Sequence, residues 1–127
     1  MRYYLTAHAI SRYVERINNG LHNSDSEINV MLKKLYAGRD VTNKVFDECP
    51  RYMLYLYERY ESLVSIVESD GIIFICNKRK GTEALYDVIT CYKKTDGFLR
   101  QWKESVMPRQ EVFIKIKLIK TKIKNKR

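Results

Sequence analysis

The chain has 127 residues, of which 45% are hydrophobic and 31% charged; these values are typical of one globular domain and exclude a collagen, a mucin and a wholly disordered chain. Apolar runs such as Ile72–Cys76 are far shorter than the ~20 residues of a membrane-spanning helix, and no signal-peptide core follows Met1, so we expect a cytoplasmic protein with three reduced cysteines. The net charge of +9, from 24 basic and 15 acidic residues, favours a polyanionic partner.

The N-terminal part of the chain predicts a short edge strand and two helices. Tyr3–Leu5 is the candidate strand, and Thr6 is a good N-cap for a helix that continues to about Asn18. The apolar residues of this first helix recur with helical spacing at Ile10, Tyr13, Val14 and Ile17. A second helix is predicted over Asp25–Ala37, with Gly38 at its end. Its apolar stripe consists of Ile28, Met31, Leu32, Leu35 and Tyr36.

After Pro50 the sequence becomes rich in β-branched and aromatic residues, which predicts strands. Ser69-Asp70-Gly71 has the composition of a tight hairpin turn, and a polar turn is expected at residues 78–82. The expected strands are Tyr52–Tyr60, Leu63–Glu68, Ile72–Asn77 and Tyr86–Lys93. We therefore predict an α+β fold in which two N-terminal helices pack on a four-stranded antiparallel sheet.

The last 30 residues form a predicted basic C-terminal extension, residues 98–127, that follows a domain of residues 1–97. Phe98–Met107 predicts a short amphipathic helix that contains the only tryptophan, Trp102. Beyond Pro108 the apolar residues fit either a strand or a helix. Pro108 at a helix start and Glu111 in a first turn favour the helix.

Most of the net charge lies in this extension, which has 10 basic and 2 acidic residues, whereas residues 1–60 have a net charge of +2 and residues 61–97 of −1. Basic clusters attract nucleic acids because each neutralised phosphate releases counterions. The alternatives are a solubilising tail and a surface for a membrane or a protein partner. The candidate nucleic-acid contacts are Lys115, Lys117, Lys120, Lys122 and Lys124.

A group of candidate catalytic residues lies on the first predicted helix. At 100° per residue, His8, Arg12, Arg16 and Glu15 share one stripe opposite the apolar face. An imidazole can transfer protons near neutral pH, and arginines can hold a phosphate and stabilise charge on phosphorus. Because RNA carries its own 2′-hydroxyl nucleophile, such a set is sufficient for metal-free RNA cleavage. The alternative is a solvated face in which Glu15 pairs with Arg12 or Arg16.

Other chemistries find little support in the sequence. His8 and His22 are the only histidines and have no metal-ligand spacing around them, so no metal is expected. The chain has no phosphate-binding glycine loop and no nucleophile motif, and we expect no cofactor. The tyrosines of the predicted strands fit the core of a sheet, although a few can stack on bases of single-stranded RNA.

The order of these elements resembles small RelE/BrnT-like proteins of bacteria and phages, and more distantly RegB-like phage endoribonucleases. The resemblance covers about residues 3–94 and rests on Thr6-Ala7-His8-Ala9, Arg12, Arg16, Gly38 and Val88-Ile89-Thr90-Cys91-Tyr92. It implies His8 as the proton-transfer residue and Arg12 and Arg16 as phosphate contacts. It also implies that Thr90 and Tyr92 project toward the same cleft, with a backbone clamp formed by Lys78, Arg79 and Lys80.

Two hypotheses follow. The first is a metal-independent endoribonuclease, toxin-like or phage-encoded, that cleaves RNA, including ribosome-bound mRNA, by 2′-hydroxyl attack. The alternative is a non-catalytic phage or mobile-element protein that binds RNA or DNA or inhibits a host nucleic-acid enzyme. An antitoxin or a host protein is a further expected partner, and no membrane partner is expected.

Overall fold

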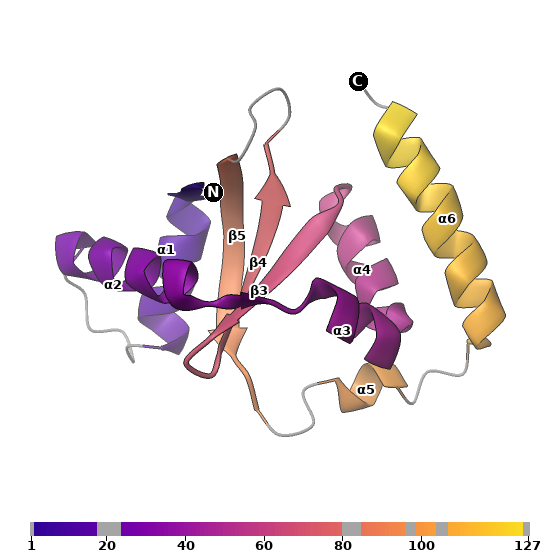
Figure 1. Ribbon diagram of the computed structural model, residues 1–127, viewed down its shortest axis with the longest axis horizontal. Coiled ribbons are helices and arrows are strands. Elements are labelled where there is room, and N and C mark those ends of the chain that lie inside the picture. Colours follow the sequence, from indigo (N-terminus) through magenta and orange to yellow (C-terminus); the bar gives the residue numbers. More distant parts are fainter. Residues whose placement is uncertain (1, 18–23, 80–84, 96–98, 104–106, 126–127) are drawn as a thin grey trace. The chain divides into compact units, whose positions relative to one another are not determined.

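The computed structural model describes residues 2–17, 24–79, 85–95, 99–103 and 107–125. Within these ranges the chain is an α+β protein with one sheet of five strands and six helices (Figure 1). The strands are β1 (Arg2–Leu5), β2 (Arg39–Asp40), β3 (Val64–Ser69), β4 (Ile72–Lys78) and β5 (Leu85–Lys93). The helices are α1 (Ala7–Arg16), α2 (Ser24–Ala37), α3 (Thr42–Glu48), α4 (Pro50–Tyr60), α5 (Arg100–Lys103) and α6 (Arg109–Asn125).

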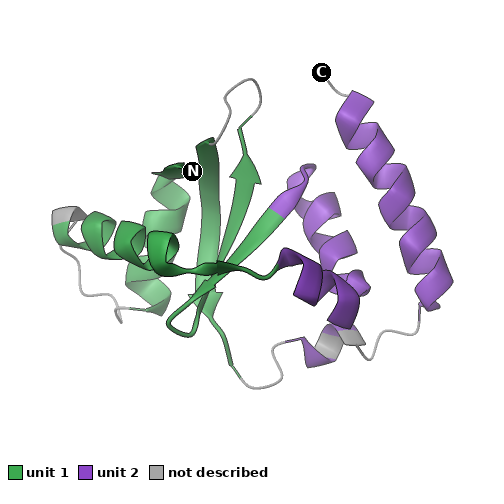
Figure 2. Cartoon of the chain, in the orientation of Figure 1, with its two compact units in different colours: residues 1–41, 65–95 green, residues 42–64, 96–127 purple. Residues whose placement is uncertain are grey.

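The chain divides into two compact units, each made from two separate segments (Figure 2). Unit 1 contains residues 1–41 and 65–95, and unit 2 contains residues 42–64 and 96–127. The predicted C-terminal extension therefore shares its unit with the segment that contains α3 and α4.

The sheet is mixed, with the strand order β1-β5-β4-β3-β2. β1 runs parallel to β5, whereas β4 pairs antiparallel with β5 and β2 with β3. The predicted hairpin is confirmed between β3 and β4, where Asp70 and Gly71 both have positive φ angles of 52° and 72°, the signature of a primed hairpin turn. The expected four-stranded antiparallel sheet is thus only roughly matched, because β1 and β2 are members of the sheet and β1 is parallel.

The predicted strand Tyr52–Tyr60 is wrong, because these residues form most of α4. Pro50 occupies the first turn, where its fixed φ angle suits a helix and its missing N–H costs no hydrogen bond. Tyr52, Met53, Leu56 and Tyr57 are buried, and their spacing is helical rather than alternating. Glu61 ends the helix in the left-handed conformation, with φ of 49°. The high β-propensity of tyrosine had favoured a strand, but the helical period of burial prevails.

The core of unit 1 lies between the sheet and the two helices α1 and α2, which cover the same face of it. Ala9 and Tyr13 of α1 and Met31 and Leu35 of α2 are at most 1% exposed. They pack against sheet residues Val67, Ile72, Phe74, Cys76, Val88 and Cys91. Leu32, predicted to belong to the buried stripe, is only half-buried, because α2 directs Met31 and Leu35 into the core instead.

Unit 2 contains the remaining helices, and within it α6 packs along α4. The helical alternative for the tail is confirmed over Arg109–Asn125, and α5 forms one turn within the predicted helix Phe98–Met107. α6 buries Val112, Ile116 and Ile123, whose spacing places them on one stripe of the helix. The basic segment is therefore a packed helix rather than a free arm.

Candidate functional site

Thr6 fixes the start of α1 against the sheet. Its hydroxyl accepts a hydrogen bond from the Ala9 backbone N–H (3.1 Å) and donates one to the Val88 carbonyl of β5 (2.7 Å). The N-cap prediction is confirmed, and the second bond holds the first turn of α1, including His8, on β5.

His8, Arg12 and Glu15 lie together on the exposed side of α1. The Nε of Arg12 donates to Nε2 of His8 at 3.4 Å, and Nη1 of Arg12 pairs with Oε2 of Glu15 at 2.8 Å. Nε2 accepts this bond through its lone pair, so the contact with Arg12 occupies that ring nitrogen. The structure thus brings an imidazole and a guanidinium into contact, with the carboxylate of Glu15 compensating the charge of Arg12.

Arg16 has a different role from the one that its position on the helix predicts. Its Nη1 donates to the backbone carbonyl of Cys91 at 3.0 Å, in a partly buried contact. This bond ties the last turn of α1 to β5. Arg16 therefore connects the helix to the sheet and does not join the contact between His8 and Arg12.

Thr90 and Tyr92 are not brought together with His8. β5 contains an irregularity at which Ile75 pairs with Thr90 and Cys76 with Val88, so Ile89 is an additional residue in the strand. Val88 and Cys91 consequently share the face that packs on α1. Thr90 and Tyr92 therefore lie on the opposite face of the sheet, because neighbouring strand residues alternate.

Of the expected clamp of Lys78, Arg79 and Lys80, the structure describes the first two residues, and Arg79 is paired with an aspartate. Lys78 is exposed at the end of β4, and Lys80 lies outside the described residues. Arg79 makes a two-pronged contact with Asp87, with distances of 2.5 and 3.3 Å, and its guanidinium lies 5.0 Å from the centre of the Tyr4 ring. The Asp87 carboxylate thus already occupies the paired N–H donors of the Arg79 guanidinium that a phosphate would need.

The predicted lysines of α6 do gather on one helix. Lys115, Lys117, Lys122 and Lys124 are exposed, whereas Lys120 is half-buried with its Nζ 5.3 Å from the Phe46 ring and 5.6 Å from the Tyr57 ring. At 100° per residue, Lys117 and Lys124 flank one side of the outward face and Lys115 and Lys122 the other. Between them lie Ile114 and Leu118, which are 60% and 65% exposed.

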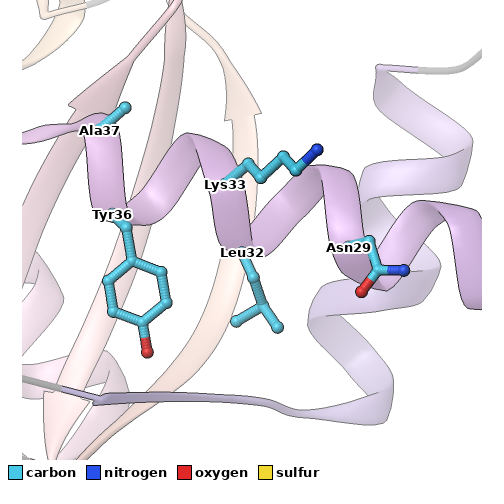
Figure 3. A pocket seen from close by; sticks show the side chains of 5 residues that line it. All are labelled: Asn29, Leu32, Lys33, Tyr36 and Ala37. Carbon is cyan, nitrogen blue, oxygen red and sulfur yellow. The ribbon is translucent and has the colours of Figure 1, made fainter.

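A cavity of about 270 Å³ in unit 1 was not anticipated from the sequence. It lies on the α2 face of the sheet and is lined by Tyr3 of β1, Tyr86 of β5, Tyr36 of α2 and Asp40 of β2 among others. A shallower hollow lies beside it on the outer surface of α2, where Leu32 and Tyr36 extend from the same side of the helix (Figure 3). Tyr36 lines both spaces. No linear motif signals the cavity, because its residues come from separate elements.

The cysteines are free and buried, which disfavours a nucleophilic role. Burial raises the pKa of the Cys76 thiol to about 12. It also raises the pKa of the Cys91 thiol to about 11, against a smaller opposing effect of Arg16. Both groups therefore remain protonated at neutral pH.

The described part of the chain contains no cluster of histidine, cysteine, aspartate or glutamate side chains that would hold a metal ion. Nor is any helix within the described ranges both long and apolar enough to cross a membrane. Comparisons with protein-family models, with curated proteins and with solved structures find no match to this chain.

Proposed function

We propose that the protein binds nucleic acid through the outward face of α6. The observation that supports this proposal is the concentration of positive charge on a helix with a fixed position in its unit. α6 carries Arg109 and five lysines but a single acidic residue, Glu111. The nearest lysine nitrogen to that carboxylate, in Lys115, is 3.8 Å away, so the pair compensates little of the charge.

The arrangement of the lysines supports contact with a phosphate backbone. Four of them are exposed in two rows along the helix, so both rows are available to a polyanion that lies along it. Lysine ammonium groups bind phosphates as point charges without sequence preference. Packing of Val112, Ile116 and Ile123 holds the helix in place, so its backbone does not have to be ordered on binding.

Neutralising one row of lysines is expected to weaken binding and its dependence on salt. For Lys117→Gln with Lys124→Gln, the slope of log K against log salt on duplex DNA should fall by about 0.9 for each phosphate that the variant no longer neutralises, or by about 0.7 on a single strand. Binding is measured by fluorescence anisotropy between about 50 and 200 mM salt, the range over which binding to phosphates weakens most visibly.

The matched control is Lys33→Gln with Lys44→Gln, which removes two exposed charges from α2 and α3. It has the same net charge as the α6 variant and should retain a steeper slope. Equal slopes for the two variants would contradict the proposal and attribute binding to net charge alone. Binding of the wild type to anionic vesicles but not to nucleic acid would assign α6 to a membrane surface instead.

Metal-independent RNA cleavage is a second candidate function, and the contact between His8 and Arg12 supports it. His8 is exposed on the first turn of α1, so its ring is accessible to a bound RNA. When Arg12 leaves Nε2 of His8 and contacts the adjacent phosphate, that nitrogen is free to accept the proton of a 2′-hydroxyl. The resemblance to RelE-like and RegB-like endoribonucleases motivates the same assignment. In this proposal Thr90 and Tyr92, on the other face of the sheet, take no part.

If this candidate is right, RNA cleavage should continue in EDTA and produce 2′,3′-cyclic phosphate ends. His8→Ala should lower the rate by about 10²–10⁴-fold, because it removes general base catalysis. His8 is exposed, so the variant should keep the wild-type melting temperature. The measurement is gel analysis of total RNA with end-group mapping.

Ser11→Ala is the matched control, because Ser11 is also exposed on α1. It should cleave like the wild type. A magnesium requirement, 5′-phosphate products or full activity in His8→Ala would exclude this mechanism. Binding without cleavage of any RNA would leave nucleic-acid binding as the function.

A further inference from the structure

The cavity of about 270 Å³ differs in charge from the rest of this basic protein. Its lining, which consists of described residues only, includes the carboxylate of Asp40 but no lysine or arginine. The neighbouring cations Arg39 and Lys34 do not line it: Arg39 pairs with Glu68 at 3.4 Å, and Lys34 pairs with Asp70 at 2.6 Å. The charged residue of the lining is thus an aspartate, in a chain with a net charge of +9.

Three tyrosine rings converge at this cavity. The rings of Tyr3 and Tyr36 meet edge to face, with centroids 5.3 Å apart and planes at 67°. The Tyr86 ring lies at a centroid distance of 6.0 Å from that of Tyr3, because the two residues are partners in the parallel pairing of β1 and β5. The three rings that line the cavity are thus inclined to one another, and each has an electron-rich face.

The pairing of β2 with β3 places Asp40 at the same cavity as the three tyrosines. Asp40 pairs with Val67 across β2 and β3, and Val67 belongs to the core beneath α2. Asp40 therefore lies on the α2 side of the sheet. The C-terminal turn of α2, which contributes Leu35 and Tyr36 to the lining, adds the negative end of the helix dipole.

The ionisation of Tyr3 agrees with this electrostatic environment. Burial, the largest cause, raises the pKa of Tyr3 to about 12, together with the neighbouring Cys76, Asp40 and other tyrosines. The Tyr3 hydroxyl is therefore protonated at neutral pH, and the space disfavours an additional negative charge.

We infer that this cavity is a binding site for a small organic cation, such as an alkylated ammonium group. The electron-rich faces of Tyr3, Tyr36 and Tyr86 attract a cation, and the Asp40 carboxylate compensates its charge. The space is about nine times the ~30 Å³ that a water molecule occupies in the liquid, so it has room for such a group. Tyr36 is 57% exposed and lines the neighbouring hollow as well, which offers a path along Leu32 for an attached chain.

This site goes beyond the proposed binding of nucleic acid, and its chemistry differs from that of α6. A phosphate or carboxylate ligand is disfavoured by Asp40 and by the helix dipole. A neutral nucleobase can stack on a tyrosine but gains nothing from the carboxylate charge. Charge dependence of binding therefore separates the organic cation from both.

The test compares choline with its neutral isostere 3,3-dimethylbutan-1-ol on the full-length wild type. Tyrosine ring signals are followed by NMR during each titration, with adenosine as a third probe. Choline should shift the Tyr3, Tyr36 and Tyr86 rings saturably and bind at least tenfold more tightly than the isostere. Equal affinity for the two compounds would overturn the proposal, as would a response to adenosine alone.

Variants locate the site. Asp40→Asn and Tyr36→Leu change exposed side chains and should each weaken choline binding at least fivefold while the melting temperature stays near the wild-type value. The matched controls are Asp47→Asn in α3 and Tyr4→Leu, which is 54% exposed on the opposite face of β1. Both should bind choline like the wild type. Equal weakening by the controls would show a diffuse surface interaction and contradict the site.

Discussion

Replacing Ile116 with aspartate is expected to unfold unit 2 or to lower its free energy of unfolding by about 4 kcal/mol or more. Ile116 is 3% exposed on the α6 stripe that packs along α4, so the variant would bury an unpaired carboxylate. Urea denaturation reports the change through the fluorescence of Trp102, whose ring lies 4.6 Å from that of Tyr55 in the same unit.

Ile114→Asp is the matched control for this experiment. Ile114 lies two residues earlier on the same helix but is 60% exposed, so the same substitution should change stability by less than about 0.5 kcal/mol. Similar stability of the two variants would show that α6 does not pack as a helix on α4. Both variants lower the net charge by one, so a difference in their stability reports the packing of the helix and not the change of charge.

The second large effect is expected in the core of unit 1. Leu35→Ala should destabilise the protein by about 2–5 kcal/mol, because Leu35 is 1% exposed and its removal leaves a void next to the existing cavity. Leu32→Ala, on the outer side of the same helix, should cost clearly less. Thermal and urea unfolding followed by far-UV circular dichroism measures both. A larger loss in Leu32→Ala would contradict the orientation of α2.

Local patterns predicted much of unit 1 correctly. Thr6 as an N-cap, α2 with Met31 and Leu35 inward, and the hairpin at Asp70-Gly71 all depend on residues close together in the sequence. Each has a specific physical signature: a short side-chain oxygen, a 3.6-residue period or two positive φ angles. These features did not need knowledge of the rest of the chain.

Long-range features were not accessible in the same way. The parallel pairing of β1 with β5 joins residues more than 80 positions apart, and no local pattern specifies it. The additional residue Ile89 in β5 reverses the faces of Thr90 and Tyr92, whereas simple alternation along the strand would place Thr90 on the same face as Val88. α4 has both an alternating and a helical apolar pattern, and only its packing distinguishes them.

The candidate sites show the same limit. The sequence identified the lysines of α6 and the stripe of His8 and Arg12 because charge and helical spacing are local. It did not identify the tyrosine-lined cavity, to which β1, α2, β2 and β5 each contribute residues. It also did not show that Arg16 and Arg79 are bound by a backbone carbonyl and by Asp87.

The interleaving of the two units constrains the order in which a growing chain can fold. Residues 1–41 leave the ribosome before residues 65–95, which contain the strands that cover α1 and α2. At ~5–20 residues per second the ribosome needs several seconds to make the intervening segment and those strands. During that interval Tyr13, Met31 and Leu35 have no sheet to pack on and are exposed to chaperones and to other nascent chains. β1 can join the sheet only after β5 exists, so β1 is made before the other strands of this sheet but is among the last to be paired.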